Sequence, residues 1–233
     1  MTALPHTARR QREHALATTA LAATAGFLVL LAVLHVVKDE YSPTWRIISE
    51  YEIGANGWIM SVAFLLLALG CAAIAVGLHG HVPTRLGRIG VGLLGLTALG
   101  LVLAAVATTD PITATSDELT THGKVHGLGA LLGIPGNLLG VTLVTHSLAR
   151  SERWATARRT LVTTTVVAWL AMAVFAVSMA VMYDGEYGPD VKIGWPNRFV
   201  IASYCAWTVA AAIHLAKLAT PPAQARVEQE AHT

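Results

Sequence analysis

Residues 57–78 read GWIMSVAFLLLALGCAAIAVGL, a run without a single charged side chain. At a rise of about 1.5 Å per residue, a helix of this length covers the roughly 30 Å of hydrocarbon in a bilayer. Backbone polar groups find no partners in lipid, so a segment that crosses it must satisfy them internally as a helix. This stretch therefore predicts a transmembrane helix in an integral membrane protein.

The rest of the chain has the same character. Its 233 residues are 54% hydrophobic and 13% charged, whereas soluble domains carry about 25% charged residues. The first apolar block is too long for the h-region of a signal peptide and lacks a cleavage site, so we predict that it is retained. Residues 1–14 and 220–233 are expected to form polar tails. Six apolar blocks predict an all-α bundle of six transmembrane helices, at about 15–37, 57–78, 87–107, 125–146, 161–183 and 199–219.

Basic and acidic residues separate along this pattern. Eleven of the 16 Lys and Arg fall in the two tails and the second and fourth loops or beside them: Arg9, Arg10, Arg12, Arg85, Arg88, Arg150, Arg153, Arg158, Arg159, Lys217 and Arg226. Ten of the 14 Asp and Glu fall in the three opposite loops: Asp39, Glu40, Glu50, Glu52, Asp110, Asp117, Glu118, Asp184, Glu186 and Asp190. The positive-inside rule thus predicts cytoplasmic N and C termini. No concentrated basic patch indicates a nucleic-acid partner.

Residues 121–140, THGKVHGLGALLGIPGNLLG, place two histidines at the start of the fourth span. At about 100° per residue, His122 and His126 share a helix face with four glycines that form two GxxxG pairs. Such pairs let helices approach closely, so both histidines are expected to point into the bundle. Pro135 would bend the helix only below them. Asn137, in mid-span, is expected to hydrogen-bond another helix.

Further ionisable residues are predicted at the same outer helix ends. Asp110 with His122 and His126 would supply two histidines and one carboxylate to a divalent metal such as zinc, leaving a position open for water or substrate. Glu50 or Glu52 would act as a general base. Arg198, at the start of the sixth span, would hold an oxyanion or a phosphate.

A structural interpretation competes with this site. The residues between the histidines are Gly-Lys-Val, so the glutamate of the zinc motif H-E-x-x-H is absent. One histidine would then meet water, the other would bond a neighbouring helix, and Arg198 would pair with a carboxylate to hold two helices together. Cys71 and Cys205, each within a span, are interpreted as small buried hydrophobic residues.

Four short motifs follow one another along the chain: ISEYEIGANGW at 48–58, TTDP at 108–111, HGKVHG at 122–127 and GWPNRF at 194–199. In these motifs the chain resembles the domain of unknown function 998 family of prokaryotic multipass membrane proteins, over about residues 20–219. Asn197 departs from the Glu or Gln expected before the arginine. The resemblance implies six spans in a prokaryotic plasma membrane and no established chemistry. It falls on Ser49, Tyr51, Gly54, Gly57, Trp58, Asp110, Pro111, His126, Gly194 and Arg198.

Two classes of function remain open at this point. The first is an enzyme with an outer-leaflet site for a lipid or lipid-linked substrate, acting by metal-activated hydrolysis or by metal-free acid chemistry such as isomerisation or cyclisation. The second is a non-catalytic membrane scaffold, sensor or subunit whose polar cluster is structural. A small-solute carrier ranks last, because no internal repeat or pair of broken helices is evident.

Overall fold

The computed structural model describes residues 6–182 and 186–220. Within these residues it contains six helices long and apolar enough to cross a membrane and no strand, which confirms the predicted all-α, six-span class. Two short 3-10 helices, η1 (Ile48–Glu52) and η2 (Glu152–Trp154), lie in loops. The six long helices are α1 (His6–Val37), α2 (Trp58–Leu78), α3 (Arg85–Val106), α4 (Thr121–Leu148), α5 (Arg158–Met182) and α6 (Gly194–Ala219).

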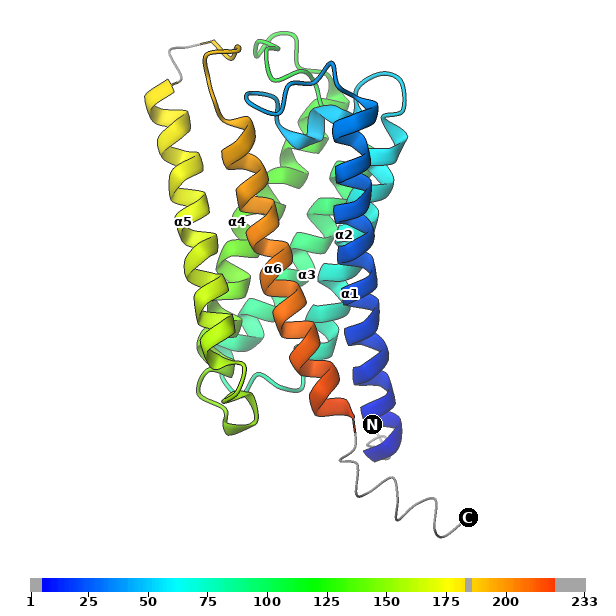
Figure 1. Cartoon of the computed structure of the whole chain (residues 1–233), viewed down its shortest axis with the longest axis vertical. Helices are drawn as coiled ribbons and strands as arrows, with labels where there is room; N and C mark the ends of the chain where they lie inside the picture. The colour runs from blue at the N-terminus through cyan, green and yellow to red at the C-terminus, as the bar shows by residue number, and fades with distance from the viewer. Residues whose placement is uncertain (1–5, 183–185, 221–233) are drawn as a thin grey trace.

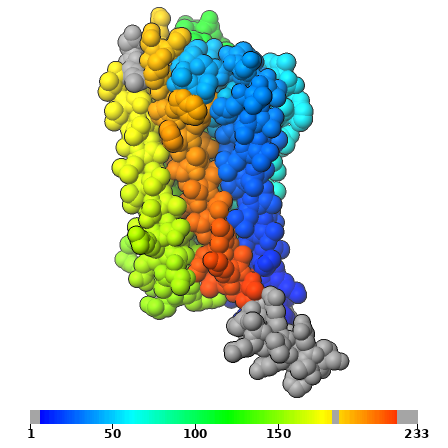
Figure 2. Space-filling model, in the orientation of Figure 1, coloured from blue at the N-terminus to red at the C-terminus, as the bar shows by residue number. Residues whose placement is uncertain are grey.

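The helices run up and down through one bundle (Figure 1). The helices α1 to α4 pack against their neighbours in the chain, and α6 packs between α1 and α5. Helices α1, α6 and α5 form the face of the molecule seen in Figure 2. Helix α1 begins and α6 ends at the same end of the bundle, here called the terminal end; the opposite end carries η1 and is called the η1 end (Figure 1). Loops 79–84 and 149–157 lie at the terminal end.

Every long helix except α2 starts earlier than its predicted span, and the local reason is clear for α1 and α4. Helix α1 begins at His6, since residues 6–14 are mostly good helix formers and Arg9 pairs with Glu13 one turn later, at 2.9 Å. Helix α4 begins at Thr121, because the Thr120 hydroxyl accepts a hydrogen bond from the Gly123 N–H at 3.0 Å and caps the helix. The predicted tail segment 221–233 and the end of the fifth span at residue 183 lie outside the described residues.

The glycine-rich face of α4 packs into the bundle, as predicted, and its partner there is α3. A Cβ atom added to Gly129 would lie 2.5 Å from the carbonyl oxygen of Gly100, and one added to Gly100 would lie 2.6 Å from that of Gly129. Any larger residue would push the two backbones apart. Helix α4 continues unbroken past Pro135, and beside the proline the Tyr204 hydroxyl of α6 donates to the Ile134 carbonyl at 2.9 Å.

The loop between α1 and α2 folds over the η1 end. Lys38 is only 2% exposed, and its ammonium donates to the carbonyls of Ile53 and, at 3.0 Å, Ala55. Gly57 leaves room for the returning chain, because a Cβ there would lie 1.9 Å from the carbonyl oxygen of Glu52. These contacts set η1 against the start of α2. Glu50 and Glu52 of η1 are thereby buried inside the bundle end.

Candidate functional site

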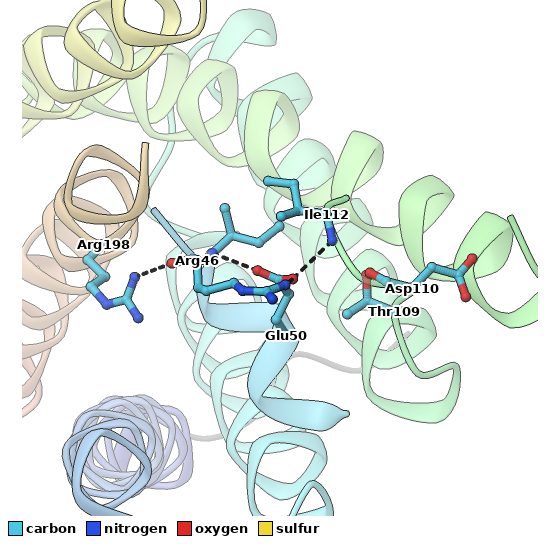
Figure 3. Close-up of polar contacts among 7 residues, drawn as sticks. Arg46, Glu50, Thr109, Asp110, Ile112 and Arg198 are labelled. Carbon is cyan, nitrogen blue, oxygen red and sulfur yellow. Dashed lines mark hydrogen bonds and ion pairs between the residues drawn. The ribbon is translucent and has the colours of Figure 1, made fainter. Parts of the chain in front are cut away.

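Arg198 joins α6 to the loop that covers the η1 end. Its side chain is 7% exposed, and Nε donates to Nε2 of His35 at 2.8 Å. The two terminal nitrogens donate to the carbonyls of Arg46 (2.7 Å) and Gly194 (3.0 Å) and to the Tyr51 hydroxyl (2.9 Å); Figure 3 shows the contact with Arg46. No described carboxylate forms an ion pair with Arg198, so neutral acceptors stand where the structural interpretation expected a carboxylate.

Glu50 is fully buried and joins two loops at the η1 end. One carboxylate oxygen accepts from Arg46 at 2.5 Å and from the backbone N–H of Ile112 at 2.9 Å, and the other accepts from the N–H of Ile47 at 3.2 Å (Figure 3). Both oxygens are therefore engaged. These contacts favour a structural role, and the role of general base stays a prediction for Glu50.

Asp110 shapes the entry of the chain into α4. Its carboxylate accepts from the backbone N–H of Thr120 at 2.8 Å and from the Thr120 hydroxyl at 2.9 Å, and Thr120 in turn caps the helix. In Figure 3 the Asp110 carboxylate points away from Glu50 and Arg198. The structure thus places Asp110 at the η1 end, as expected, but apart from the other two charged residues.

The two histidines of α4 have different surroundings. His126 is 5% exposed, and its Nδ1 lies 2.9 Å from the carbonyl oxygen of Ala107 and 3.2 Å from that of Ala104. His122 is exposed, because the first turn of α4 extends beyond the end of α3 at Val106. The expected inward orientation therefore holds for His126 and is wrong for His122.

The predicted metal set is not assembled in the described part of the chain. No three His, Cys, Asp or Glu side chains gather there around one point suited to a metal ion. Asp110 contacts Thr120, His126 contacts the end of α3, and His122 faces outward. Metal binding by these three residues stays a prediction.

The carboxylate beside His126 belongs to Glu52. Its Oε2 lies 3.2 Å from Nδ1 of His126, and its Oε1 accepts from the Ser61 hydroxyl at 3.2 Å. Carbonyl oxygens only accept hydrogen bonds, so the bond to Ala107 places a proton on Nδ1 of His126. Glu52 Oε2 lies beside this N–H without accepting an aligned bond from it. In the neutral ring Nε2 is then an acceptor, and it has no hydrogen-bond partner among the described residues.

His126 borders a cavity of about 230 Å³ between α2, α3, α4 and α6. The walls are mainly apolar, with Phe64, Leu101 and Ile201 among them. Asn137, deeper along α4, also lines the cavity; it is 2% exposed, and its Oδ1 has no hydrogen-bond partner among the described residues. Asn137 Oδ1 thus lacks the predicted hydrogen bond to another helix.

The rim of this cavity lies at the η1 end. Gly127, next to His126, is exposed, and Ile47 and Thr109 are half-buried. Asn197 lines the cavity and accepts a hydrogen bond from the Ile48 N–H at 3.2 Å, so it helps to hold η1 in place. Sequence reasoning found His126 but neither the cavity nor its pairing with Glu52, since both depend on how four helices and a loop pack.

These features define a multi-pass helical membrane protein with a cavity inside the bundle near one end. The chain belongs to the family described as protein of unknown function (DUF998), whose model matches residues 21–214. No curated protein and no solved structure is significantly similar to it. Tyr51, Asp110, His126 and Arg198, four of the residues on which the resemblance falls, all make side-chain contacts at the η1 end.

Proposed function

We propose that this protein binds an amphiphilic ligand, a lipid or a lipid-linked compound, in the cavity beside His126. One observation carries the proposal: the lining of a mainly apolar cavity of about 230 Å³ includes Asn137, whose buried Oδ1 no described residue satisfies, and His126, whose Nε2 has no hydrogen-bond partner among the described residues. Leaving Asn137 Oδ1 buried and unpaired costs about 1–3 kcal/mol. An apolar cavity of about 150 Å³ already holds benzene, so the volume suits an organic group.

The chemistry of the two atoms defines the class of ligand. Both accept hydrogen bonds when the imidazole is neutral, so the ligand would present a donor such as a hydroxyl or an amine. Its apolar part would contact Phe64, Leu101 and Ile201. The side-chain amide of Asn137 would add a donor for a carbonyl or ester oxygen.

We place the η1 end on the outer side of a prokaryotic plasma membrane, with both termini in the cytoplasm. Support comes from the basic residues at the terminal end and the acidic residues at the η1 end, which follow the positive-inside rule. In this orientation the cavity would lie within the outer leaflet, where a membrane lipid could enter it.

A lipid-modifying enzyme is the second candidate, favoured by the pair Glu52–His126. In hydrolytic triads a carboxylate accepts the Nδ1–H of a histidine whose Nε2 acts as the general base. Here the Glu52 carboxylate lies 3.2 Å from Nδ1 while that N–H bonds the Ala107 carbonyl, so this chemistry would require the N–H to turn to Glu52. Ser49 lines the same cavity and would offer a hydroxyl. A metal-dependent version would require Asp110 and His122 to move towards His126, so we propose the metal-free version. A scaffold or sensor, the remaining alternative, needs no ligand in the cavity.

A photoreactive long-chain alcohol bearing a diazirine tests ligand binding in detergent-purified protein. Asn137→Leu replaces the amide with an apolar side chain of similar shape, so we expect it to reduce labelling up to about tenfold through the loss of one neutral hydrogen bond to the alcohol. Thr163→Leu is the matched control, since Thr163 is an exposed residue on α5. Equal labelling of both variants would contradict the proposal. The enzyme is tested separately, by mass spectrometry of lipids incubated with the protein. A change in lipid mass that the native protein produces and His126→Gln does not would favour the enzyme.

A further inference from the structure

A second cavity lies at the terminal end, outside the site described above. It has a volume of about 720 Å³ and lies over α2, between α1 and α3. Its mouth is polar and includes Arg9, Arg12 and His79, whereas Leu16, Val76 and Gly95 form an apolar floor. The polar residues stand where the apolar runs of α1 and α2 end, so the cavity crosses the boundary between headgroups and hydrocarbon.

The mouth carries positive charge that the protein does not neutralise. Arg9 donates from Nε to Glu13 at 2.9 Å, and another of its nitrogens lies over Gly80, 3.1 Å from where a Cβ would be. That nitrogen has no acceptor among the described residues. Arg12 is exposed and makes no ion pair within the described chain. The two guanidinium groups at the mouth are thus accompanied by one carboxylate, that of Glu13. Glu13 also interacts with His81, whose Nε2 lies 3.2 Å from Glu13 Oε1.

The floor has room for an alkyl chain. A Cβ added to Gly95 would meet no atom within 4 Å, and Val76 is 47% exposed. Ligand sites in proteins span about 300–1,000 Å³, so the volume suits a headgroup together with the first part of a chain. The combination of a cationic mouth and an apolar floor matches a molecule with an anionic head and an apolar tail.

We propose that this second cavity, a groove at the terminal end, binds an anionic phospholipid from the leaflet at that end. The phosphate would accept hydrogen bonds from Arg9 and Arg12, as basic pockets between transmembrane helices bind anionic headgroups. One acyl chain would run over Val76 and Gly95. This site is independent of the cavity beside His126, which lies at the opposite end of the bundle.

Native mass spectrometry of the detergent-purified protein tests the proposal, with phosphatidylglycerol and phosphatidylcholine of equal chain length as probes. We expect preferential binding of phosphatidylglycerol, weakened about fivefold by loss of each arginine and about 25-fold in R9Q/R12Q. The matched control, R158Q/R159Q, removes equal charge from exposed positions outside the groove at the same end and should change binding by about twofold or less. Equal losses in the two double variants would overturn the proposal.

Gly95→Leu tests the apolar floor without changing charge. Open space surrounds the site of its Cβ, and leucine favours a helix more than glycine does, so the variant should fold. We expect it to reduce phosphatidylglycerol binding while all arginines remain. Undiminished binding would indicate a site for a soluble anion and would overturn the proposal. If R9Q/R12Q does not fold, because Arg9 also supports Glu13, the Gly95→Leu result decides alone.

Discussion

Oε2 of Glu52 lies 3.2 Å from Nδ1 of His126, so the loop after α1 meets α4 inside the bundle. The two residues are distant in sequence, and each is at most 5% exposed. The carbonyl of Ala107 fixes the proton on Nδ1, and Glu52 lies beside it. The opposite ring nitrogen, Nε2, has no hydrogen-bond partner among the described residues, and His126 lines the cavity, so this pair is the chemical centre of the proposed site.

The pair should be energetically coupled. In a double-mutant cycle of Glu52→Gln and His126→Gln, we expect a coupling energy of about 0.5–3 kcal/mol in the free energy of unfolding in detergent, because the two side chains are in contact. A cycle of Glu52→Gln with His214→Gln serves as control, since His214 bonds the Arg153 carbonyl at the terminal end. Its effects should add to within about 0.5 kcal/mol. Additivity in both cycles would show that the pair has no functional or structural link.

Arg198 should act as a structural link between α6 and the covering loop. Arg198→Lys keeps the charge but loses the planar set of donors that reaches His35, Tyr51 and two carbonyls, so we expect a loss of about 2–4 kcal/mol in stability. Arg158→Lys, at an exposed position, should change little. Thermal unfolding in detergent measures both. Unchanged stability together with lost ligand binding would instead support the oxyanion or phosphate clamp.

The α3–α4 contact should tolerate no side chain at Gly129. Gly129→Ala would drive a methyl group against the Gly100 carbonyl, and overpacking of this kind costs about 1–3 kcal/mol. Gly127→Ala, on the same helix, meets no atom within 4 Å and should be neutral or stabilising by up to about 1 kcal/mol. The comparison uses the unfolding temperature of the two variants. Equal unfolding temperatures of Gly129→Ala and Gly127→Ala would contradict the close approach of α3 and α4.

His81, in the loop between α2 and α3, should make stability depend on pH. Burial lowers its pKa below the usual value of about 6.5, an effect that nearby Glu13 opposes and that Arg153 and Arg9 reinforce. The unfolded chain therefore takes up a proton at a higher pH than the folded chain. Stability should be fully present above about pH 6.5 and fall as the pH drops towards the folded pKa.

His81→Gln isolates this effect from other titrating groups. The difference in unfolding temperature between the native protein and the variant, measured in detergent from about pH 7.5 to 5.5, should shrink as the pH falls. A difference that does not vary with pH would show that His81 keeps the same pKa in the folded and unfolded states.

Asp110 should contribute to the start of α4. Asp110→Asn weakens the bonds to Thr120, so we expect a loss of about 1 kcal/mol in stability and no change in the metal content of the purified protein. Elemental analysis tests the second part. Stoichiometric zinc in the native protein that is lost in folded Asp110→Asn and His126→Ala would support the predicted metal set instead.

The helices could be predicted from sequence, because the requirement for about 20 apolar residues acts locally. The inward orientation of the glycine stripe and the burial of His126 could also be predicted, since helical periodicity orients successive residues, but the identity of α3 as the partner helix could not. The exposure of His122 could not be predicted from the sequence, because it depends on where α3 ends. The partners of Glu50 and Arg198 depend on the path of the covering loop, which no periodic pattern encodes.

The cavity was likewise beyond sequence reasoning. Asn137 was placed in mid-span, where a polar side chain usually finds a partner on another helix. Its Oδ1 finds none among the described residues, because the cavity separates it from α2 and α6. A void is a property of four packed surfaces, and no single segment carries its signal.

The position of the cross-link formed by the diazirine alcohol tests the central claim most directly. Peptide mass spectrometry of labelled native protein should place the label on the cavity wall, in the α4 segment 126–137 or the α6 segment 201–208, and excess unlabelled long-chain alcohol should prevent it. Label confined to lipid-facing residues such as Val174 and Val177 of α5, and insensitive to competitor, would contradict binding in the cavity.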